Sequence, residues 1–221
     1  MRLLAPQPDD PDTLLEEAEP LPLGGQRRQP AVIDGLRPVD LDHAERAVAD
    51  LLVALGQDPE SEHLRDTPRR VAAAYAELLT PLQFNPTTFP NDEGYNGLVL
   101  AKAIPFNSLC EHHLLPFSGF AHVGYLPGDR ILGLSKLARV VQLFARRLQV
   151  QERLTKQIAD WIEQHLEPQG VGVVLEAEHT CMSLRGVRAT GSRTVTSTLY
   201  GALRDDPRSR QELFSCAGAV T

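Results

Sequence analysis

The sequence has few cysteines, no long apolar run and no excess of positive charge, and each absence argues against a class of protein. Only three of its 221 residues are cysteines, at scattered positions, which argues against a disulfide-stapled scaffold. The lack of any run of about 18 apolar residues predicts that no segment spans a membrane. The net charge of −7 argues against nonspecific binding to nucleic acid. Any anionic ligand must therefore be held by a local cluster of cations.

The first 40 residues also lack the features of a targeting segment. They begin MRLLAPQPDDPDTLLEEAEP, where one arginine is followed by prolines and acids and no apolar core of a signal peptide occurs. We therefore expect a cytoplasmic protein. The composition and weak periodicity of residues 1–40 predict a mobile arm. Such an arm is compatible with two roles, a passive extension or a segment that binds a partner.

Two helices are predicted directly after the arm. Apolar residues recur at helical spacing between Leu41 and Leu55. A second helix is predicted in DTPRRVAAAYAELLTP, with Thr67 as its N-cap and Pro68 in the first helical position. We interpret residues 41–95 as an N-terminal helical segment.

Residues 96–221 have the pattern of a domain that mixes strands and helices. LVLAKAI and GFAHVGYL are typical of strands, as are VGVVLEAEHTCMSLRG and SRTVTSTLYGAL. Between the two pairs, residues 135–167 show helical periodicity that resets near QVQER. The order strand, strand, helix, helix, strand, strand predicts an α+β fold, with a four-stranded antiparallel sheet and helices packed on one face.

A group of metal-binding residue types lies in NSLCEHHLLPFSG, residues 107–119. Cys110 and His113 have the spacing C-x-x-H, which alone is a weak signal because it supplies two ligands. A third ligand is expected from the strand that begins near residue 171. Alternate residues of a strand share a face, so an uninterrupted strand would present His179 and Cys181 in succession. The alternative for Cys181 is a buried small hydrophobic residue.

The chemistry of this candidate group favours zinc. Two thiolates and an imidazole suit zinc better than magnesium or calcium, which prefer oxygen ligands. Three protein ligands leave one tetrahedral position for water, which is typical of catalytic zinc. Such an ion lowers the pKa of its water from about 15.7 to about 7. The group therefore predicts hydrolytic chemistry at neutral pH.

Cations cluster where a helix is predicted to begin in GLSKLARVV. Ser135 stands at the expected N-cap, and Lys136 and Arg139 share a face in the first turns. Free N–H groups at a helix start favour anions, so this segment is a candidate phosphate site. Arg185, on the same predicted strand face as Cys181, supports this interpretation. Arg65 would be a further phosphate contact if the fold or a neighbouring subunit brings it close. The alternative is a solvated basic face.

Glu152 lies at the apparent break in the helical pattern, in QVQERL. A carboxylate can accept two parallel hydrogen bonds, and guanine offers N1–H and its 2-amino group as a matching pair of donors. A site that depends on such a pair can discriminate by about 10⁴-fold or more. The alternative is an exposed helix residue without such a role.

Several long strings together resemble GTP cyclohydrolase I. They are TPRRVA, SLCEHHLLPFSG, GYLPGDRILGLSKLARVVQLFARRLQVQERLTKQIA, GVGVVLEAEHTCMSLRGVR and SRTVTSTLYG. The similarity runs from about residue 42 to about residue 215, which is most of the chain beyond the arm.

The resemblance implies a reaction and the residues that carry it. Members of the family convert GTP and water into 7,8-dihydroneopterin triphosphate and formate, the entry to pterin and tetrahydrofolate biosynthesis and so to one-carbon metabolism. The implied zinc ligands are Cys110, His113 and Cys181, and the implied acid/base residues are His112 and His179. The implied GTP contacts are Glu152 and Gln151 for guanine, and Arg65, Ser135, Lys136, Arg139 and Arg185 for the triphosphate.

The resemblance also implies a tunnelling fold (T-fold) for residues 96–221 and a homodecamer with active sites shared between subunits. Neither nucleic acid nor a membrane is expected as a partner. Two rival hypotheses are a different pterin or purine enzyme on the same fold and a noncatalytic, zinc-bound oligomeric protein. The presence of both His112 and His179 argues against the second.

Overall fold

The computed structural model describes residues 38–218. The arm predicted over residues 1–40 lies almost wholly outside the described residues. Within the described part of the chain, no helix combines the length and the apolar character needed to cross a membrane.

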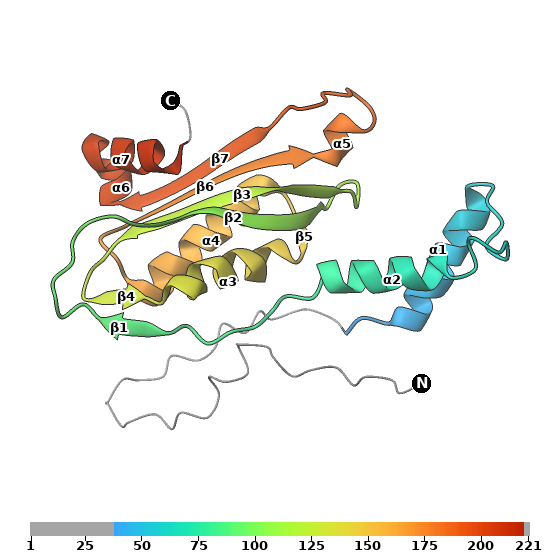
Figure 1. The fold of residues 1–221 in the computed structure, drawn as a ribbon, viewed down its shortest axis with the longest axis horizontal. Helices are drawn as coiled ribbons and strands as arrows, with labels where there is room; N and C mark the ends of the chain where they lie inside the picture. Colours follow the sequence, from blue (N-terminus) through green and yellow to red (C-terminus); the bar gives the residue numbers. More distant parts are fainter. Residues whose placement is uncertain (1–37, 219–221) are drawn as a thin grey trace, which may run out of the picture.

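An antiparallel pair of helices precedes the sheet and extends away from it (Figure 1). These are α1 (Leu41–Ala54) and α2 (Thr67–Leu78). The side chain of Asp40 caps α1 by accepting a hydrogen bond from the His43 backbone N–H. The predicted N-cap of α2 is wrong by one residue. Thr67 is already the first helical residue, so Asp66 is the N-cap. The Asp66 carboxylate makes no capping hydrogen bond and instead pairs with Arg70 at 3.1 Å.

The main sheet contains the four predicted strands and one short strand that the sequence did not reveal. Its order is β5-β2-β3-β6-β7, antiparallel throughout except that β5 runs parallel to β2. The prediction of four strands is therefore corrected to five, because the two residues of β5 are too few to show a strand period. The five strands are β2 (Val99–Cys110), β3 (Pro116–Leu126), β5 (Leu148–Gln149), β6 (Gly170–His179) and β7 (Thr194–Gly201).

Two long helices cover one face of this sheet, as predicted (Figure 1). They are α3 (Leu134–Ala145) and α4 (Gln151–Leu166), and β5 is the break between them. Their apolar faces and alternate residues of β3 and β6 form the hydrophobic core. A separate two-stranded sheet pairs β1 (Thr88–Pro90) with β4 (Arg130–Leu132) beside the start of α3.

The opposite face of the sheet is not bare. The helices α6 (Ala202–Asp205) and α7 (Pro207–Ala217) pack there, on the side away from α3 and α4 (Figure 1). Gly124 and Gly172 are cross-strand partners on this face, and a Cβ at Gly172 would lie only 2.3 Å from Leu213 of α7. The prediction of helices on one face is therefore incomplete, since this glycine pair leaves room for a second layer.

Candidate functional site

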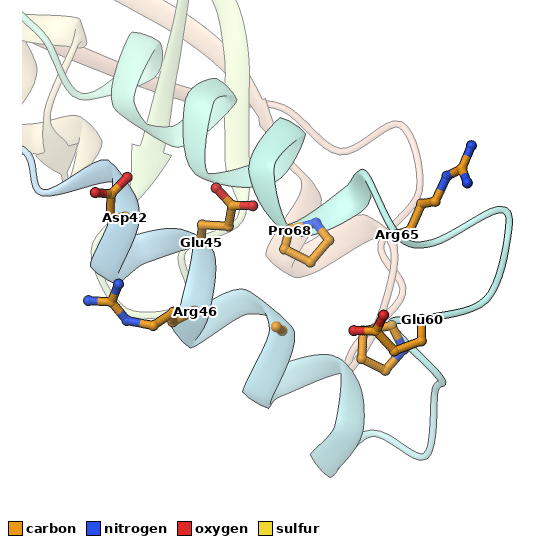
Figure 2. Close-up of a pocket in the computed structure, with 8 residues that line it drawn as sticks. Asp42, Glu45, Arg46, Glu60, Arg65 and Pro68 are labelled. Atoms are coloured by element: carbon orange, nitrogen blue, oxygen red, sulfur yellow. The ribbon is translucent and has the colours of Figure 1, made fainter.

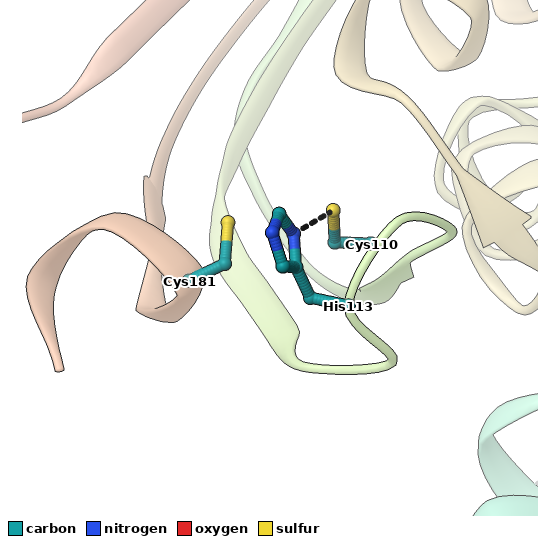
Figure 3. A group of neighbouring side chains, drawn as sticks. All are labelled: Cys110, His113 and Cys181. Carbon is teal, nitrogen blue, oxygen red and sulfur yellow. Dashed lines mark hydrogen bonds between the residues drawn. The ribbon is translucent and has the colours of Figure 1, made fainter. Parts of the chain in front are cut away.

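The three predicted metal ligands meet at one end of the sheet (Figure 3). One ligand atom from each of Cys110, His113 and Cys181 lies within 4.8 Å of the other two. The Cys110 Sγ atom is 3.6 Å from His113 Nδ1. Cys110 and Cys181 are 6% and 9% exposed, whereas His113 is exposed. Two thiols and one imidazole, with no carboxylate among them, fit zinc and similar soft ions.

Local folding explains how each ligand reaches this place. Cys110 is the last residue of β2, and His113 lies in the loop 111–115, which we name the ligand loop. Cys181 arrives by a route that the sequence argument did not foresee. The strand β6 ends at His179, and Cys181 belongs to the helical turn α5 (Thr180–Ser183).

The strand alternation used to predict the third ligand is therefore wrong, although its choice of residue agrees with the observed cluster. The backbone turns helical after His179, so positions 179, 181 and 185 do not share one strand face. The hydroxyl of Thr180 donates to the Pro116 carbonyl at 2.6 Å and joins α5 to the start of β3. This contact, rather than strand periodicity, brings Cys181 to the ligand loop.

Electrostatics at the cluster disfavour the thiolate form of Cys181 in the absence of a cation. Burial raises the pKa of the Cys181 thiol, and the neighbouring Cys110 raises it further. A divalent ion reverses this preference because it stabilises thiolates directly. Metal binding at this site is therefore expected to release protons.

His179 lies beside the cluster in a defined orientation. Its ring stacks on Phe117 with centroids 4.5 Å apart and planes 4° from parallel. Burial lowers the pKa of His179, and the nearby Glu152 carboxylate opposes that shift. The His179 Nε2 atom is 2.8 Å from the side-chain oxygen of Gln151. That oxygen can only accept, so Nε2 carries a proton and Nδ1 of the neutral ring is left as the base.

The side chain of Gln151 is buried and fully engaged. The two hydrogens of its amide nitrogen are shared among three acceptors, the Leu175 and Thr194 carbonyls at 3.2 and 2.9 Å and the Thr196 hydroxyl at 3.1 Å. Gln151 is 1% exposed. The structure thus places this predicted guanine contact beneath His179, while its neighbour Glu152 is exposed at the start of α4.

We expect the substitution Gln151→Leu to lower the free energy of unfolding by about 1–3 kcal/mol, because it leaves buried partners without hydrogen bonds. Urea denaturation of the metal-free protein measures this change. Gln211→Leu, at an exposed position of α7, is the matched control and should change stability by less than about 0.5 kcal/mol. Equal stability of the two variants would contradict the role of the buried amide.

His112 and Glu111 lie in the ligand loop, and sequence reasoning left Glu111 without a role. His112 is exposed, and its Nε2 atom is 3.8 Å from the Glu111 carboxylate. Glu111 forms an ion pair with Arg153 of α4, and this hydrogen bond lowers the pKa of the Glu111 carboxyl. The sequence did offer a signal for both residues. Glu111 lies between the ligand Cys110 and the predicted acid/base residue His112, and Arg153 directly follows the predicted guanine contact Glu152.

The predicted triphosphate residues are not brought together within one chain. Arg185 lies near the cluster and donates to the Cys181 carbonyl at 3.1 Å. Ser135, Lys136 and Arg139 lie in the first turns of α3, whereas β5, which follows α3, pairs with the Cys110 end of β2. Twelve residues of helix span about 18 Å, so the start of α3, with Ser135 and Lys136, lies well away from the β5 end, and Arg139 is in the middle of the helix (Figure 1).

Two details of these cations differ from the sequence prediction. The N-cap of α3 is Gly133, not Ser135, and the Lys136 N–H donates to the Gly133 carbonyl at 2.9 Å. Arg65 lines a surface pocket of about 360 Å³ between α1 and α2, with acidic residues of α1 opposite it. Figure 2 shows its side chain pointing away from those acids. None of the residues that line this pocket belongs to the metal group.

Comparison with known proteins identifies the family. The family model described as GTP cyclohydrolase I matches residues 44–218. GTP cyclohydrolase 1 of Streptomyces avermitilis is 52% identical over 196 residues, covering 84% of this chain and 96% of the relative. GTP cyclohydrolase 1 of Aquifex aeolicus is 50% identical over 182 residues, covering 82% and 99%.

A similar result comes from Corynebacterium glutamicum, whose GTP cyclohydrolase 1 is 49% identical over 185 residues, covering 81% of this chain and 94% of the relative. The apo crystal structure of the archaeosine synthase QueF-Like covers 48% of this chain and 94% of its own, with a TM-score of 0.39 and 15% identity, values too low to support an argument. The extent and identity of the sequence matches show that this chain belongs to the GTP cyclohydrolase I family.

Proposed function

We propose that this protein is a zinc-dependent GTP cyclohydrolase I that converts GTP and water into 7,8-dihydroneopterin triphosphate and formate, the first step of pterin and tetrahydrofolate biosynthesis. The observation that carries the proposal is the group of Cys110, His113 and Cys181 with His179 and Arg185 at the same end of the sheet. Family membership suggests the reaction, and this group of side chains is the proposed site of that reaction.

Each side chain has a role that follows from its position. Cys110, His113 and Cys181 would hold the zinc ion, which supplies Lewis acidity and an activated water when bound. His179 presents Nδ1 as a base, because Gln151 fixes the proton on Nε2. His112, exposed in the ligand loop, is the second group proposed to transfer protons as the imidazole ring of guanine opens. Glu152 is exposed beside His179 and is proposed to accept from guanine N1–H and its 2-amino group.

The distribution of cations supports a shared active site. Arg185 hydrogen-bonds to the backbone of the metal ligand Cys181, whereas Ser135, Lys136 and Arg139 lie in the first half of α3 and Arg65 lines a pocket between α1 and α2. We therefore propose that a neighbouring subunit contributes the remaining phosphate contacts, as in the homodecamer implied by the family resemblance. A T-fold for residues 96–221, an N-terminal helical segment for residues 41–95, an arm over residues 1–40 and a cytoplasmic location belong to the same proposal.

The decisive experiment follows formate release and pterin absorbance after the purified full-length protein is mixed with GTP. We expect formate and pterin in equal amounts, loss of both on chelation and recovery of both with zinc. ATP, which lacks the guanine donor pair, should give neither product. Formate without pterin would indicate that the ring opens but the later rearrangement does not proceed, and no formate from a folded, zinc-loaded protein would refute the cyclohydrolase assignment.

A further inference from the structure

Arg153 makes contacts that neither the sequence resemblance nor the proposed reaction assigns. It lies in the first turn of α4 and pairs with the Glu111 carboxylate in the ligand loop. The same guanidinium donates to the Leu148 carbonyl at 2.8 Å and to the Gln149 side chain at 2.9 Å. One side chain thus joins α4, β5 and the ligand loop.

The inner end of this connection is rigid. Gln149 is 1% exposed, and its amide nitrogen donates to the Phe144 carbonyl at 2.9 Å and to the Gln157 side chain at 2.8 Å. The buried Gln149 side chain therefore helps to fix the orientation of Arg153, whose own side chain is 41% exposed. This distinguishes it from an ordinary surface ion pair, which holds two mobile side chains and contributes little.

The ligand loop, which Arg153 contacts through Glu111, needs such support. Glu111 stands between the ligand Cys110 and His112, in a loop whose next ligand, His113, is exposed. Leu114 has a φ of 54°, a left-handed conformation that a side chain with a Cβ disfavours. Strained residues of this kind persist where surrounding contacts hold them in place. The Tyr75 hydroxyl donates to the Leu114 carbonyl at 2.9 Å and restrains the far side of the loop.

The charges near the site also indicate that Arg153 holds Glu111 and the ligand loop in place. With a metal bound, the site contains two thiolates and, in the ligand loop, the Glu111 carboxylate. The Arg153 guanidinium supplies a compensating positive charge and keeps the carboxylate directed towards α4. Without it, Glu111 is free to turn towards the metal group or into solvent.

We propose that Arg153 is a positioning residue that fixes the ligand loop through Glu111, and that this connection slows the loss of metal and orients His112. The part concerning His112 rests on the proposed function, whereas the part concerning metal retention does not. The residues on either side of Glu152 then have parallel tasks, since Gln151 orients His179 and Arg153 orients the loop that carries His112.

The test measures the rate at which the full-length, zinc-loaded protein loses zinc to an excess of a colorimetric chelator. We expect Arg153→Gln and Glu111→Gln each to release zinc about 10-fold faster, the lower end of the effect seen when groups that orient metal ligands are changed. Because both act through one contact, the double variant should release zinc no faster than either single variant. Arg153→Lys keeps the positive charge but loses the planar pair of N–H donors, so it should release zinc at a rate between those of the parent protein and Arg153→Gln.

Arg193→Gln is the matched control. Arg193 pairs with Glu176 at 3.3 Å, and the side-chain exposures of that pair, 47% and 40%, resemble the 41% and 32% of Arg153 and Glu111. Zinc release from this variant should equal that of the parent protein. Thermal unfolding of the metal-free variants checks that each is folded, and if Arg153→Gln does not fold, Glu111→Gln alone decides the question.

Unchanged zinc release in both single variants, or additive effects in the double variant, would overturn the proposal. With GTP as substrate, we further expect a lower kcat at an unchanged KM in Arg153→Gln, since base and phosphate contacts remain. A parent protein that releases no formate would refute the proposed function and leave the zinc-release comparison valid, so the two failures can be distinguished.

Discussion

A Cys181→Ala variant is expected to bind almost no zinc and to lose formate release by about 10³-fold or more, because unactivated water with a pKa of about 15.7 supplies little nucleophile at neutral pH. The substitution removes one of three ligands whose atoms lie within 4.8 Å of one another. The remaining thiol and imidazole form an incomplete site, since catalytic zinc is generally held by three protein ligands. Metal content by atomic emission and formate release from GTP measure the two effects.

Cys216→Ala is the control for this experiment. Cys216 is an exposed cysteine of α7 and does not belong to the metal group. Its substitution therefore removes a thiol without changing a metal ligand. Its metal content and formate release should match those of the parent protein. A Cys181→Ala variant that retains about one zinc per chain would show that the metal is held elsewhere.

A His179→Ala variant is expected to keep its zinc but to release formate about 10²–10⁴-fold more slowly, the usual loss when a general acid or base is removed. His179 lies two residues from Cys181 but outside the ligand group, and its Nε2 atom is occupied by Gln151. The expected loss is in kcat, because guanine and triphosphate contacts are assigned to other residues. Steady-state kinetics with GTP and metal analysis separate the two effects.

The chain offers a close match for this substitution in His165. That ring also stacks on an aromatic side chain, Trp161, with centroids 4.2 Å apart, and its Nδ1 atom is 2.8 Å from the Trp161 carbonyl. His165→Ala therefore removes a stacked histidine elsewhere in the fold and should leave kcat within about 2-fold of the parent value. Equal loss of activity in both variants would assign the effect of His179 to packing rather than to proton transfer.

Local pattern was sufficient for the elements with strong periodicity. The helices α1 and α2, the four long strands and the helix break at QVQER follow from spacing of apolar residues and from turn residues. Helix starts were less accurate, since Asp66 and Gly133 rather than Thr67 and Ser135 are the N-caps. A cap depends on the dihedral angles of one residue, which the neighbouring chain sets.

In the candidate site, too, some features could be predicted from the sequence and others only from the tertiary structure. The C-x-x-H spacing and the family resemblance pointed to Cys110, His113 and Cys181, and the structure brings these three residues together. The strand alternation used to choose Cys181 was wrong, because the backbone turns helical after His179. Tertiary structure alone decided that Gln151 hydrogen-bonds to His179 and that Arg153 reaches Glu111.

The sequence by itself determined the chemical types present, the helices and strands with clear periods, and the family to which they belong. Only the tertiary structure decided which polar groups meet, because a hydrogen bond between Gln151 and His179 or an ion pair between Arg153 and Glu111 joins residues tens of positions apart. Such contacts have no period in the chain. They exist because α4 packs against β6 and β7 and β5 pairs with β2, which brings those side chains within reach.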